Sequence, residues 1–342
     1  MPAVSIITAT RNRPAVLATA LDSISRQTLT DYEVIVVDDG SPEGVHEEYC
    51  RLLKPFGGRA RVLRKDPLRD RSGTPAIARN RGINEARGTW VAFLDDDDRW
   101  IDPRHLEVAV MCLEATQSDL YFANMRGERN GVVEVTDYYP DSAFLTSGLC
   151  VQDDPHVFQV TLKSMVGALR HHSIHPDVVV VSRELLVSVG AFCERIVFSE
   201  DYELMMRVVD RAQSVLYRPD PVAMYALPIL GSHSLRVQPI DQLLDRQTAA
   251  QNVRIKCTRP EVRRCARQRE SWVLRELADV VEEASLGEAL RLRCQAWVAH
   301  PSVGSLWSLL QSKLAARFNG TSRTIFTDFR PVAANSIVWP SH

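Results

Sequence analysis

Short apolar runs alternate with amphipathic stretches over the first 125 residues of the chain. The apolar runs are rich in β-branched residues and predict strands at 4–9, 32–37, 61–64, 90–94 and 120–123. Between them we expect helices from Pro14 to about residue 24, up to about Tyr49, at 75–86 and at 102–114. Strands that alternate with helices predict an α/β fold, in which a mostly parallel, Rossmann-like sheet has helices on both faces.

Capping signals mark two ends of these predicted helices. Gly88 follows the helix at 75–86 and is expected as its C-terminal cap. Asp102 and Pro103 are expected as an N-cap followed by proline at the first helical position.

Polar segments follow three of the predicted strands, at 8–12, 38–41 and 95–98. In open α/β sheets, ligands bind outside the carboxyl ends of the strands. The topology therefore predicts that these three segments lie together on one rim of the sheet.

The pattern changes twice beyond this region. Residues 127–227 are mixed, with strands expected at 178–181, 215–217 and 222–227 and helices at 183–189 and after Ser199. From about Val237 the chain is expected to be helical almost to Phe318. We therefore expect one domain at 1–235, with a change of pattern near residue 125 that divides it into 1–125 and 126–235, and a C-terminal helical region at 236–342.

Composition narrows the class of protein without changing this picture. Apolar residues make up 45% and charged residues 25%, and 41 basic against 43 acidic residues leave a formal charge of −2. This balance argues against a nucleic-acid partner. No apolar run approaches the ~20 residues of a membrane-spanning helix, and no leader pattern precedes Val4. The expected location is the cytoplasm, with peripheral contact at the inner membrane face left open.

The seven cysteines are widely spaced and form no CxxC motif. Neither a disulfide framework nor a structural zinc site is expected. At most of these positions we expect a small buried side chain.

Four consecutive aspartates, Asp95 to Asp98, follow the predicted strand at 90–94. Like charges this close repel one another, and a hard divalent cation such as Mg²⁺ or Mn²⁺ relieves the repulsion while also binding phosphate oxygens. The alternative is a solvated acidic turn, and the cluster alone does not decide between the two.

Three further groups have both a structural and a functional interpretation. Asp38 and Asp39 suit a turn or a contact with a base or ribose. Arg79 suits a solvated helix face or a phosphate contact. Glu200 and Asp201 suit the first turn of a helix, or a general base acting on an acceptor hydroxyl.

Taken together, six motifs resemble glycosyltransferase family 2, the inverting nucleotide-sugar enzymes of the GT-A fold. In chain order they are VSIITATRNR at 4–13, LDSISRQ at 21–27, VVDDGS at 36–41, ARNRGI at 78–83, FLDDDD at 93–98, and GAF at 190–192 with SEDY at 199–202. The resemblance covers residues 1 to about 235, and it implies that this region is a catalytic domain with a nucleotide-sugar half (1–125) and an acceptor half (126–235).

The resemblance implies a role for each matching residue. The nucleotide would be bound by Thr8, Thr10, Asn12, Asp39, Arg79 and Asp96. Asp97 and Asp95 would hold the metal, with Asp97 as the direct ligand. On a later loop, His233 suits either a contact with the metal or diphosphate or an ordinary surface position, and Arg236 would assist at phosphate. Asp201 would be the catalytic base, with Glu200 as its neighbour.

The implied reaction is a metal-assisted single displacement that moves a sugar from a nucleoside diphosphate to an acceptor hydroxyl with inversion. UDP is the first expectation for the carrier, with dTDP and GDP as alternatives, and the acceptor would be a glycan, a lipid-linked or a small molecule. A non-catalytic nucleotide-sugar-binding scaffold is the alternative from another class. A sugar nucleotidyltransferase is disfavoured, because the segment 8–12 contains no glycine.

The remaining candidates are weaker. His171, His172 and His175 are expected on an acceptor-side loop, and Trp297 and Trp307 in a core. The basic run at 254–269 suits a solvated helix face or contact with anionic lipid, and a homodimer is left open.

Overall fold

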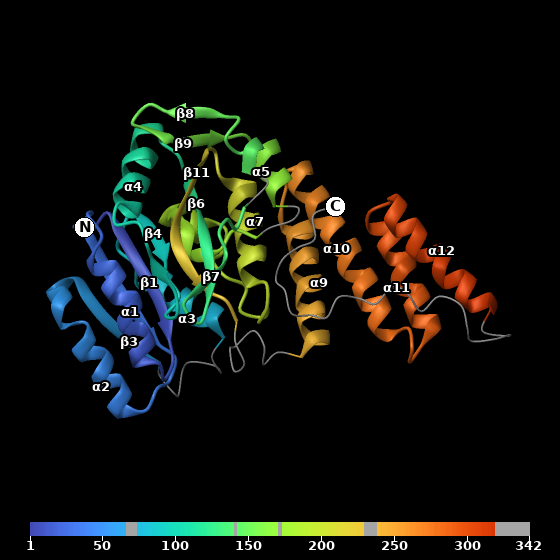
Figure 1. Cartoon of the computed structure of the whole chain (residues 1–342), viewed down its shortest axis with the longest axis horizontal. Helices are drawn as coiled ribbons and strands as arrows, with labels where there is room; N and C mark the ends of the chain where they lie inside the picture. The colour runs from blue at the N-terminus through green and yellow to red at the C-terminus, as the bar shows by residue number, and fades with distance from the viewer. Residues whose placement is uncertain (66–73, 140–141, 170–172, 229–237, 319–342) are drawn as a thin grey trace. The chain divides into compact units, whose positions relative to one another are not determined.

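The computed structural model of the chain describes residues 1–65, 74–139, 142–169, 173–228 and 238–318. The chain divides into two compact units, Met1–Arg264 and Cys265–His342. Within the described residues, the first unit contains the strands and the helices up to α9 (Figure 1). This division follows backbone contacts, so the functional boundary expected near residue 235 stays a prediction.

A single mixed sheet of eleven strands forms the centre of the first unit. Its strands are β1 (Val4–Thr10), β2 (Tyr32–Asp38), β3 (Ala60–Arg64), β4 (Trp90–Phe93), β5 (Arg99–Trp100), β6 (Leu120–Arg129), β7 (Val132–Val135), β8 (Leu149–Val151), β9 (Asp154–Val160), β10 (Val179–Ser182) and β11 (Val215–Ala226). The main order is β3-β2-β1-β4-β10-β6-β11-β9-β8. Strands β3, β2, β1 and β4 are parallel, as are β6 and β11, while β10 runs antiparallel between β4 and β6.

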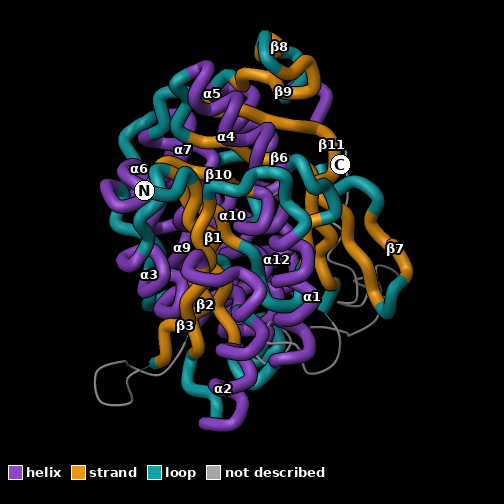
Figure 2. The backbone as a smooth tube through the Cα atoms, turned by 90° about the vertical axis from the view of Figure 1, so that its left-hand side faces the viewer, coloured by secondary structure: helices purple, strands orange, loops and turns teal. Residues whose placement is uncertain are grey.

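Helices flank this sheet, as Figure 2 shows for the orange strands among purple helices. They are α1 (Pro14–Ser25), α2 (Glu43–Leu52), α3 (Pro75–Glu85), α4 (His105–Thr116), α5 (Leu162–Ala168), α6 (Arg183–Ser188), α7 (Glu200–Arg211) and α9 (Pro239–Lys256), with 3₁₀ turns at Lys54–Arg59, Ser142–Phe144 and Pro176–Val178. The central strands are buried almost throughout, since Ile6, Ile35, Val91 and Val180 are fully inaccessible. Burial of both sheet faces explains why these strands are continuous apolar runs. The α/β class and the mostly parallel sheet core are confirmed.

Two predicted caps were wrong. Helix α3 ends at Glu85 with Ala86 as its C-cap, so Gly88 lies beyond it. A Cβ at Gly88 would be 2.6 Å from the Ser5 backbone nitrogen, so glycine is required there by the close approach of β1. Helix α4 begins at His105, and Asp102 instead accepts from the Arg104 amide and pairs with Arg218.

The second half of the first unit was predicted less completely. The strands expected at 215–217 and 222–227 are one strand, β11, with bulges near Pro221. The hairpins formed by β6 with β7 and by β8 with β9 carry no strong period-2 apolar pattern, because most of β7 and much of β8 and β9 are exposed.

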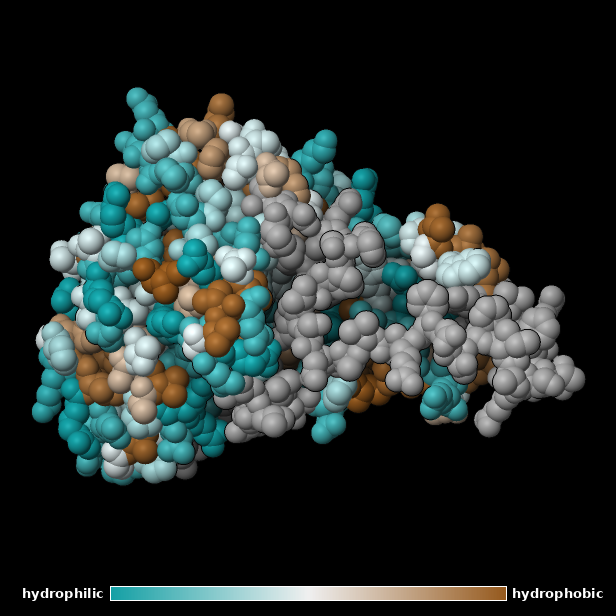
Figure 3. Space-filling model, in the orientation of Figure 1, coloured by the Kyte–Doolittle hydropathy of each residue, from teal (hydrophilic) through white to brown (hydrophobic). Residues whose placement is uncertain are grey.

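The second unit is helical, with α11 (Leu286–Ala299) and α12 (Val303–Phe318) following α10 (Pro260–Val281), which crosses the boundary between units. The expectation of a buried Trp307 was wrong, because its side chain is 61% exposed. Val303, Leu306 and Leu310 on the same helix are also exposed, and Figure 3 shows apolar side chains on the surface over α11 and α12. Trp297 is partly exposed.

Two other sequence predictions concern the chain as a whole. Only Cys112, Cys257 and Cys265 are buried, so the expectation that most cysteines are buried was wrong. Within the described residues, no helix is long and apolar enough to cross a membrane.

Candidate active site

The carboxyl ends of β1, β2 and β4 meet at one rim, as the topology predicts. Thr10, the last residue of β1, is in register with Asp38, the last residue of β2. Its hydroxyl donates to Asp96 Oδ2 at 2.7 Å, which joins the first polar segment to the acidic one. Thr8 is fully buried, and its hydroxyl has no hydrogen-bond partner among the described residues.

The segment after β2 forms a braced turn. Asp38 accepts from the Ser41 amide at 2.8 Å and lies 3.0 Å from Nδ1 of His46. Ser41 Oγ accepts from the amide of Asn12, whose φ of 54° lies in the left-handed region that asparagine tolerates. The side chain of Asp39 pairs with Lys65 at 3.1 Å. Asp38 therefore stabilises the turn, whereas Asp39 forms an ion pair with Lys65 at the edge of the turn.

Arg13 joins two of the four aspartates and was not predicted as a site residue. Its guanidinium donates to Asp96 at 2.8 Å and to Asp97 at 2.5 Å. Burial raises the pKa of Asp96 to about 7, although Arg13 and Thr10 oppose that rise. The signal available in the sequence was a basic residue one position after Asn12, on the rim that the topology had already identified.

Arg79 lies between the acidic motif and the helix that carries the predicted base. It donates to both carboxylate oxygens of Asp95, at 2.6 and 2.9 Å, and to Glu200 at 3.0 Å. Burial disfavours its charge, but Asp95 and Glu200 outweigh burial, so the pKa of Arg79 is raised. The interpretation of Arg79 as a solvated helix arginine was wrong, and a contact with nucleotide stays a prediction.

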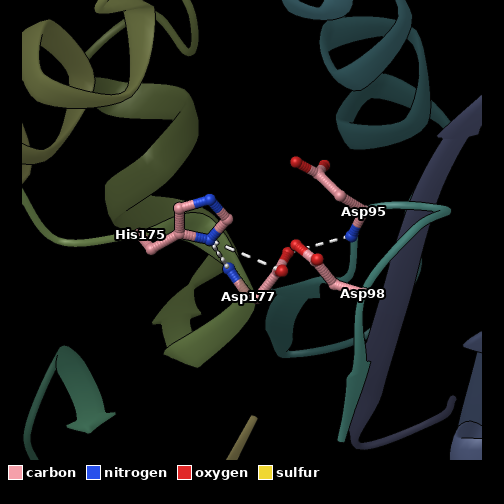
Figure 4. Close-up of side chains that lie close together, drawn as sticks. All are labelled: Asp95, Asp98, His175 and Asp177. Carbon is pink, nitrogen blue, oxygen red and sulfur yellow. Dashed lines mark hydrogen bonds and ion pairs between the residues drawn. The ribbon is translucent and has the colours of Figure 1, made fainter. Parts of the chain in front are cut away.

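A second group of side chains lies next to the acidic motif: Asp95, Asp98, His175 and Asp177. One potential ligand atom from each lies within 4.8 Å of the others (Figure 4). Asp177 Oδ1 accepts from the Asp95 amide at 2.9 Å, and Asp98 Oδ1 accepts from the Ala226 amide at 2.7 Å. The other oxygen of each carboxylate is buried, and Oδ2 of Asp177 lies 3.5 Å from Nδ1 of His175.

The pKa values of Asp98 and Asp177 are both raised above the ordinary value of an aspartate. Burial raises the pKa of Asp98 well above its ordinary value, and the adjacent Asp177 raises it further. Burial also raises the pKa of Asp177, and His175 opposes that rise from 3.5 Å. Two buried carboxyl groups this close are stabilised by a proton or a cation between them.

His175 lies on a loop, as expected, and its assignment to the acceptor side stays a prediction. Its ring lies 4.9 Å from the ring of Tyr225 on β11 and its Nδ1 faces Asp177, so it borders the acidic group. Neither Asp177 nor Tyr225 was singled out from the sequence. His171, His172, His233 and Arg236 lie outside the described residues.

Glu200 and Asp201 open α7, the helix expected after Ser199. Ser199 occupies the N-cap position with a φ of 71°, and its side chain makes no capping hydrogen bond. Burial raises the pKa of Glu200 to about 7, Arg79 opposes that rise, and Asp201 adds to it. One carboxylate oxygen of Asp201 accepts from the Tyr202 amide at 2.7 Å.

Comparison with known proteins decides the family. A sequence profile described as Glycosyl transferase family 2 matches residues 5–157. These residues form a glycosyl transferase family 2 domain. The family 2 domain contains the predicted nucleotide residues and the four aspartates, whereas Glu200 and Asp201 lie beyond the matched residues.

One relative extends the likeness past that domain. EpsH of Bacillus subtilis (strain 168), named as a candidate glycosyltransferase, is 28% identical over 231 residues, which are 66% of this chain and 61% of EpsH. The chain thus spans about three fifths of the length of this relative.

Two solved structures share the fold. Residues 1–349 of S. aureus TarS in complex with UDP-GlcNAc match with a TM-score of 0.63 and 18% identity, over 96% of this chain and 95% of that one. The mannosyltransferase PcManGT of Pyrobaculum calidifontis, in complex with GDP-Man and Mn²⁺, matches with a TM-score of 0.56 and 19% identity, over 93% of this chain and 81% of that one. The expected GT-A fold is confirmed.

Proposed function

We propose that the protein is an inverting glycosyltransferase that moves a sugar from a nucleoside diphosphate to an acceptor hydroxyl. The observation that carries the proposal is the double ion pair of Arg79, which holds Asp95 of the acidic motif and Glu200 beside Asp201. One buried guanidinium thus connects the rim that would receive the donor to the group that would activate the acceptor. The named ligands of TarS and PcManGT, UDP-GlcNAc and GDP-Man, support a nucleotide-sugar donor.

The residues present suit a divalent cation at this rim. Asp97 is the most exposed of the three aspartates that pair with an arginine, with 37% of its side chain accessible. Asp95 lies beside it and belongs to the group with Asp98, His175 and Asp177, whose potential ligand atoms lie within 4.8 Å of one another. We propose Asp97 and Asp95 as ligands, with His233 as a third. When bound, the cation would neutralise charge on the departing diphosphate.

The chain's own residues would perform the remaining steps. Thr8, Thr10 and Asn12 would line the nucleotide pocket, with Asp39 at the base and Asp96 at the ribose. Asp201 would take the proton from the acceptor hydroxyl, whose oxygen attacks the anomeric carbon as the bond to the diphosphate oxygen breaks on the opposite face. Arg79 would hold Glu200, and so Asp201, at a fixed position relative to the acidic motif.

Several finer points belong to the same proposal. The catalytic region would be 1–235, with UDP as carrier before dTDP or GDP, and the acceptor a glycan, a lipid-linked or a small molecule. A cytoplasmic location, contact with the inner membrane face and a homodimer stay predictions. A binding-only scaffold is the second candidate, because similarity to glycosyltransferases also fits a protein that keeps the site without turnover.

A thermal-shift panel with UDP, dTDP, GDP and ADP, each with and without Mn²⁺, tests the proposal. A ligand at 100 times its Kd stabilises the folded state by about 2.7 kcal/mol. We expect UDP to raise the melting temperature most, and mainly with Mn²⁺. The variant Asp97→Ala should lose the Mn²⁺-dependent part of the shift, whereas Asp22→Ala, which removes an exposed carboxylate from α1, should keep it.

Two results would contradict the proposal. Absence of a shift with every nucleotide would argue against a nucleotide-binding rim. A shift with UDP and Mn²⁺, but no release of UDP from any UDP-sugar, would favour the binding-only scaffold.

A further inference from the structure

Helix α9 lies beyond both the family 2 domain and the catalytic region expected from the sequence, yet polar contacts connect it to α7 and the loop before α7. Asn252 donates to the Cys193 sulfur at 3.6 Å, and Lys256 pairs with the fully buried Glu203 at 3.0 Å. Just after α9, the Arg259 amide donates to Asp210 at 2.8 Å. Polar contacts therefore hold α9 against α7, the helix that carries Glu200 and Asp201.

One residue of α9 holds the loop that leads directly into that element. Asp245 Oδ2 accepts hydrogen bonds from the Val197 amide at 3.1 Å and the Phe198 amide at 3.0 Å. The neighbouring Arg246 places its guanidinium 5.2 Å from the centre of the Phe198 ring. A carboxylate that accepts from two consecutive amides fixes both the position and the direction of that backbone.

The next residue needs such support. Ser199 has a φ of 71°, a left-handed conformation that is unfavourable for a non-glycine residue, and its side chain makes no capping bond. On its C-terminal side, the Ser199 carbonyl accepts from the Glu203 amide at 3.2 Å. On its N-terminal side, the nearest contacts that fix the backbone are the two bonds to Asp245.

We propose that Asp245 is a positioning residue for the reaction: from outside the family 2 domain, it holds the 197–199 backbone so that Glu200 and Asp201 meet the acceptor at the right place. This inference rests on the proposed function. A shift of about 1 Å in a reacting group can cost ~10²-fold in rate, so loosening this loop should slow turnover while leaving the nucleotide rim intact.

The experiment compares Asp245→Ala, Asp245→Asn and a control, Asp241→Ala, which removes an exposed carboxylate from the same helix. Steady-state release of UDP from UDP-GlcNAc, or from the donor that the panel identifies, gives kcat and KM, with water or acceptor as the second substrate. Hydrogen exchange of peptides covering 197–201 measures the loop directly, independently of activity.

We expect Asp245→Ala to lower kcat by ~10-fold or more, to leave donor KM and the UDP-dependent melting shift within about twofold, and to speed exchange at 197–201. Asp245→Asn keeps an accepting oxygen and should restore most of kcat, and Asp241→Ala should match the wild type. Unchanged kcat and exchange in Asp245→Ala would overturn the proposal, as would equal loss of kcat and donor binding.

The two proposals fail in distinguishable ways. If the wild-type protein turns over no donor, the proposed function fails, and the exchange measurement still tests whether Asp245 holds the loop. If the wild type is active and Asp245→Ala is equally active, only the positioning role fails.

Discussion

Four consecutive aspartates have four different environments in this protein. Asp95 is bound by Arg79 and Asp97 by Arg13, while Asp96 is shared between Arg13 and Thr10. Asp98 is buried against Asp177 and accepts from a backbone amide. The four aspartates thus differ in exposure, because successive side chains point in different directions after the end of β4.

This division explains what single-residue reasoning could and could not predict. The acidic motif was recognisable because carboxylates after a buried strand are unusual. The partners Arg13, His175 and Asp177 were not, since arginine, histidine and aspartate have no distinctive spacing there. The contacts of Arg13 and Asp177 with the acidic motif join residues about 80 positions apart. Charge pairing of this kind depends on the tertiary fold.

At this scale we predict the effect of Asp201→Asn. Because asparagine cannot take a proton from the acceptor, transfer should fall by ~10²–10⁴-fold. The UDP-dependent melting shift should persist, because none of the described contacts of Asp201 involves a residue of the nucleotide rim. Transfer assays and thermal shift on the same preparation check this, and an equal loss of both would identify Asp201 as structural.

At the scale of elements, the parallel strands β1 to β4 were predictable and the later hairpins were not. The former are buried on both faces and therefore consist of apolar runs. Strands β7 and β8 lie near the sheet margin, and their exposed residues carry no period that separates them from loops. Helix boundaries were wrong at Gly88 and Asp102, because both residues serve contacts with other elements.

Gly88 offers a direct test of the packing of β1. A methyl group there would meet the Ser5 nitrogen at 2.6 Å and the Val4 carbonyl carbon at 2.8 Å, and backbone atoms of a central strand cannot move aside cheaply. Gly88→Ala should therefore lower stability by roughly 1–3 kcal/mol, measured as a lower urea midpoint.

Gly44→Ala is the matched control. Gly44 lies in α2, and no atom lies within 4 Å of the point that an added methyl group would occupy, so the same substitution should raise stability by up to about 1 kcal/mol. A neutral Gly88→Ala would mean that β1 shifts more easily than its burial implies.

Glu33 on β2 connects β1 and β3 through hydrogen bonds that depend on the ionisation of its carboxyl group. Burial opposes its charge, but hydrogen bonds from Ser5 on β1 and Arg61 on β3 outweigh burial, so the pKa of Glu33 is lowered from 4.5. A lowered pKa means that the stabilisation is present above pH 4.5 and is lost as the pH falls through the folded-state value.

Glu33→Gln should therefore be less stable than the wild type at pH 7, by about 1–3 kcal/mol. The difference should narrow below pH 4.5. Urea midpoints across this range check it, with Glu43→Gln as a control because its carboxylate is 65% exposed on α2. A difference that does not change with pH would show that Glu33 acts through packing alone.

At the scale of the whole molecule, the candidate site lies on both sides of β10. This strand runs antiparallel to both of its neighbours, and we call this position the break in strand direction. Strands β1, β2 and β4 supply the rim, and antiparallel β10 separates them from β6 and β11. The short turn before β10 carries Asp177, and the loop after α6 leads to Glu200. Motif order along the chain indicated the family, but the contacts that cross this break depend on the sheet order, which the sequence does not encode in any local pattern.

Two adjacent residues of α3 span this break. Arg79 binds Asp95 and Glu200, while Asn80 donates to the Phe192 carbonyl and accepts from the Phe192 amide. In a chimera between relatives, α3 and the segment from β10 to α7 should therefore be exchanged together. A chimera that imports a relative's acceptor half without its matching α3 would separate partners that have to be inherited together.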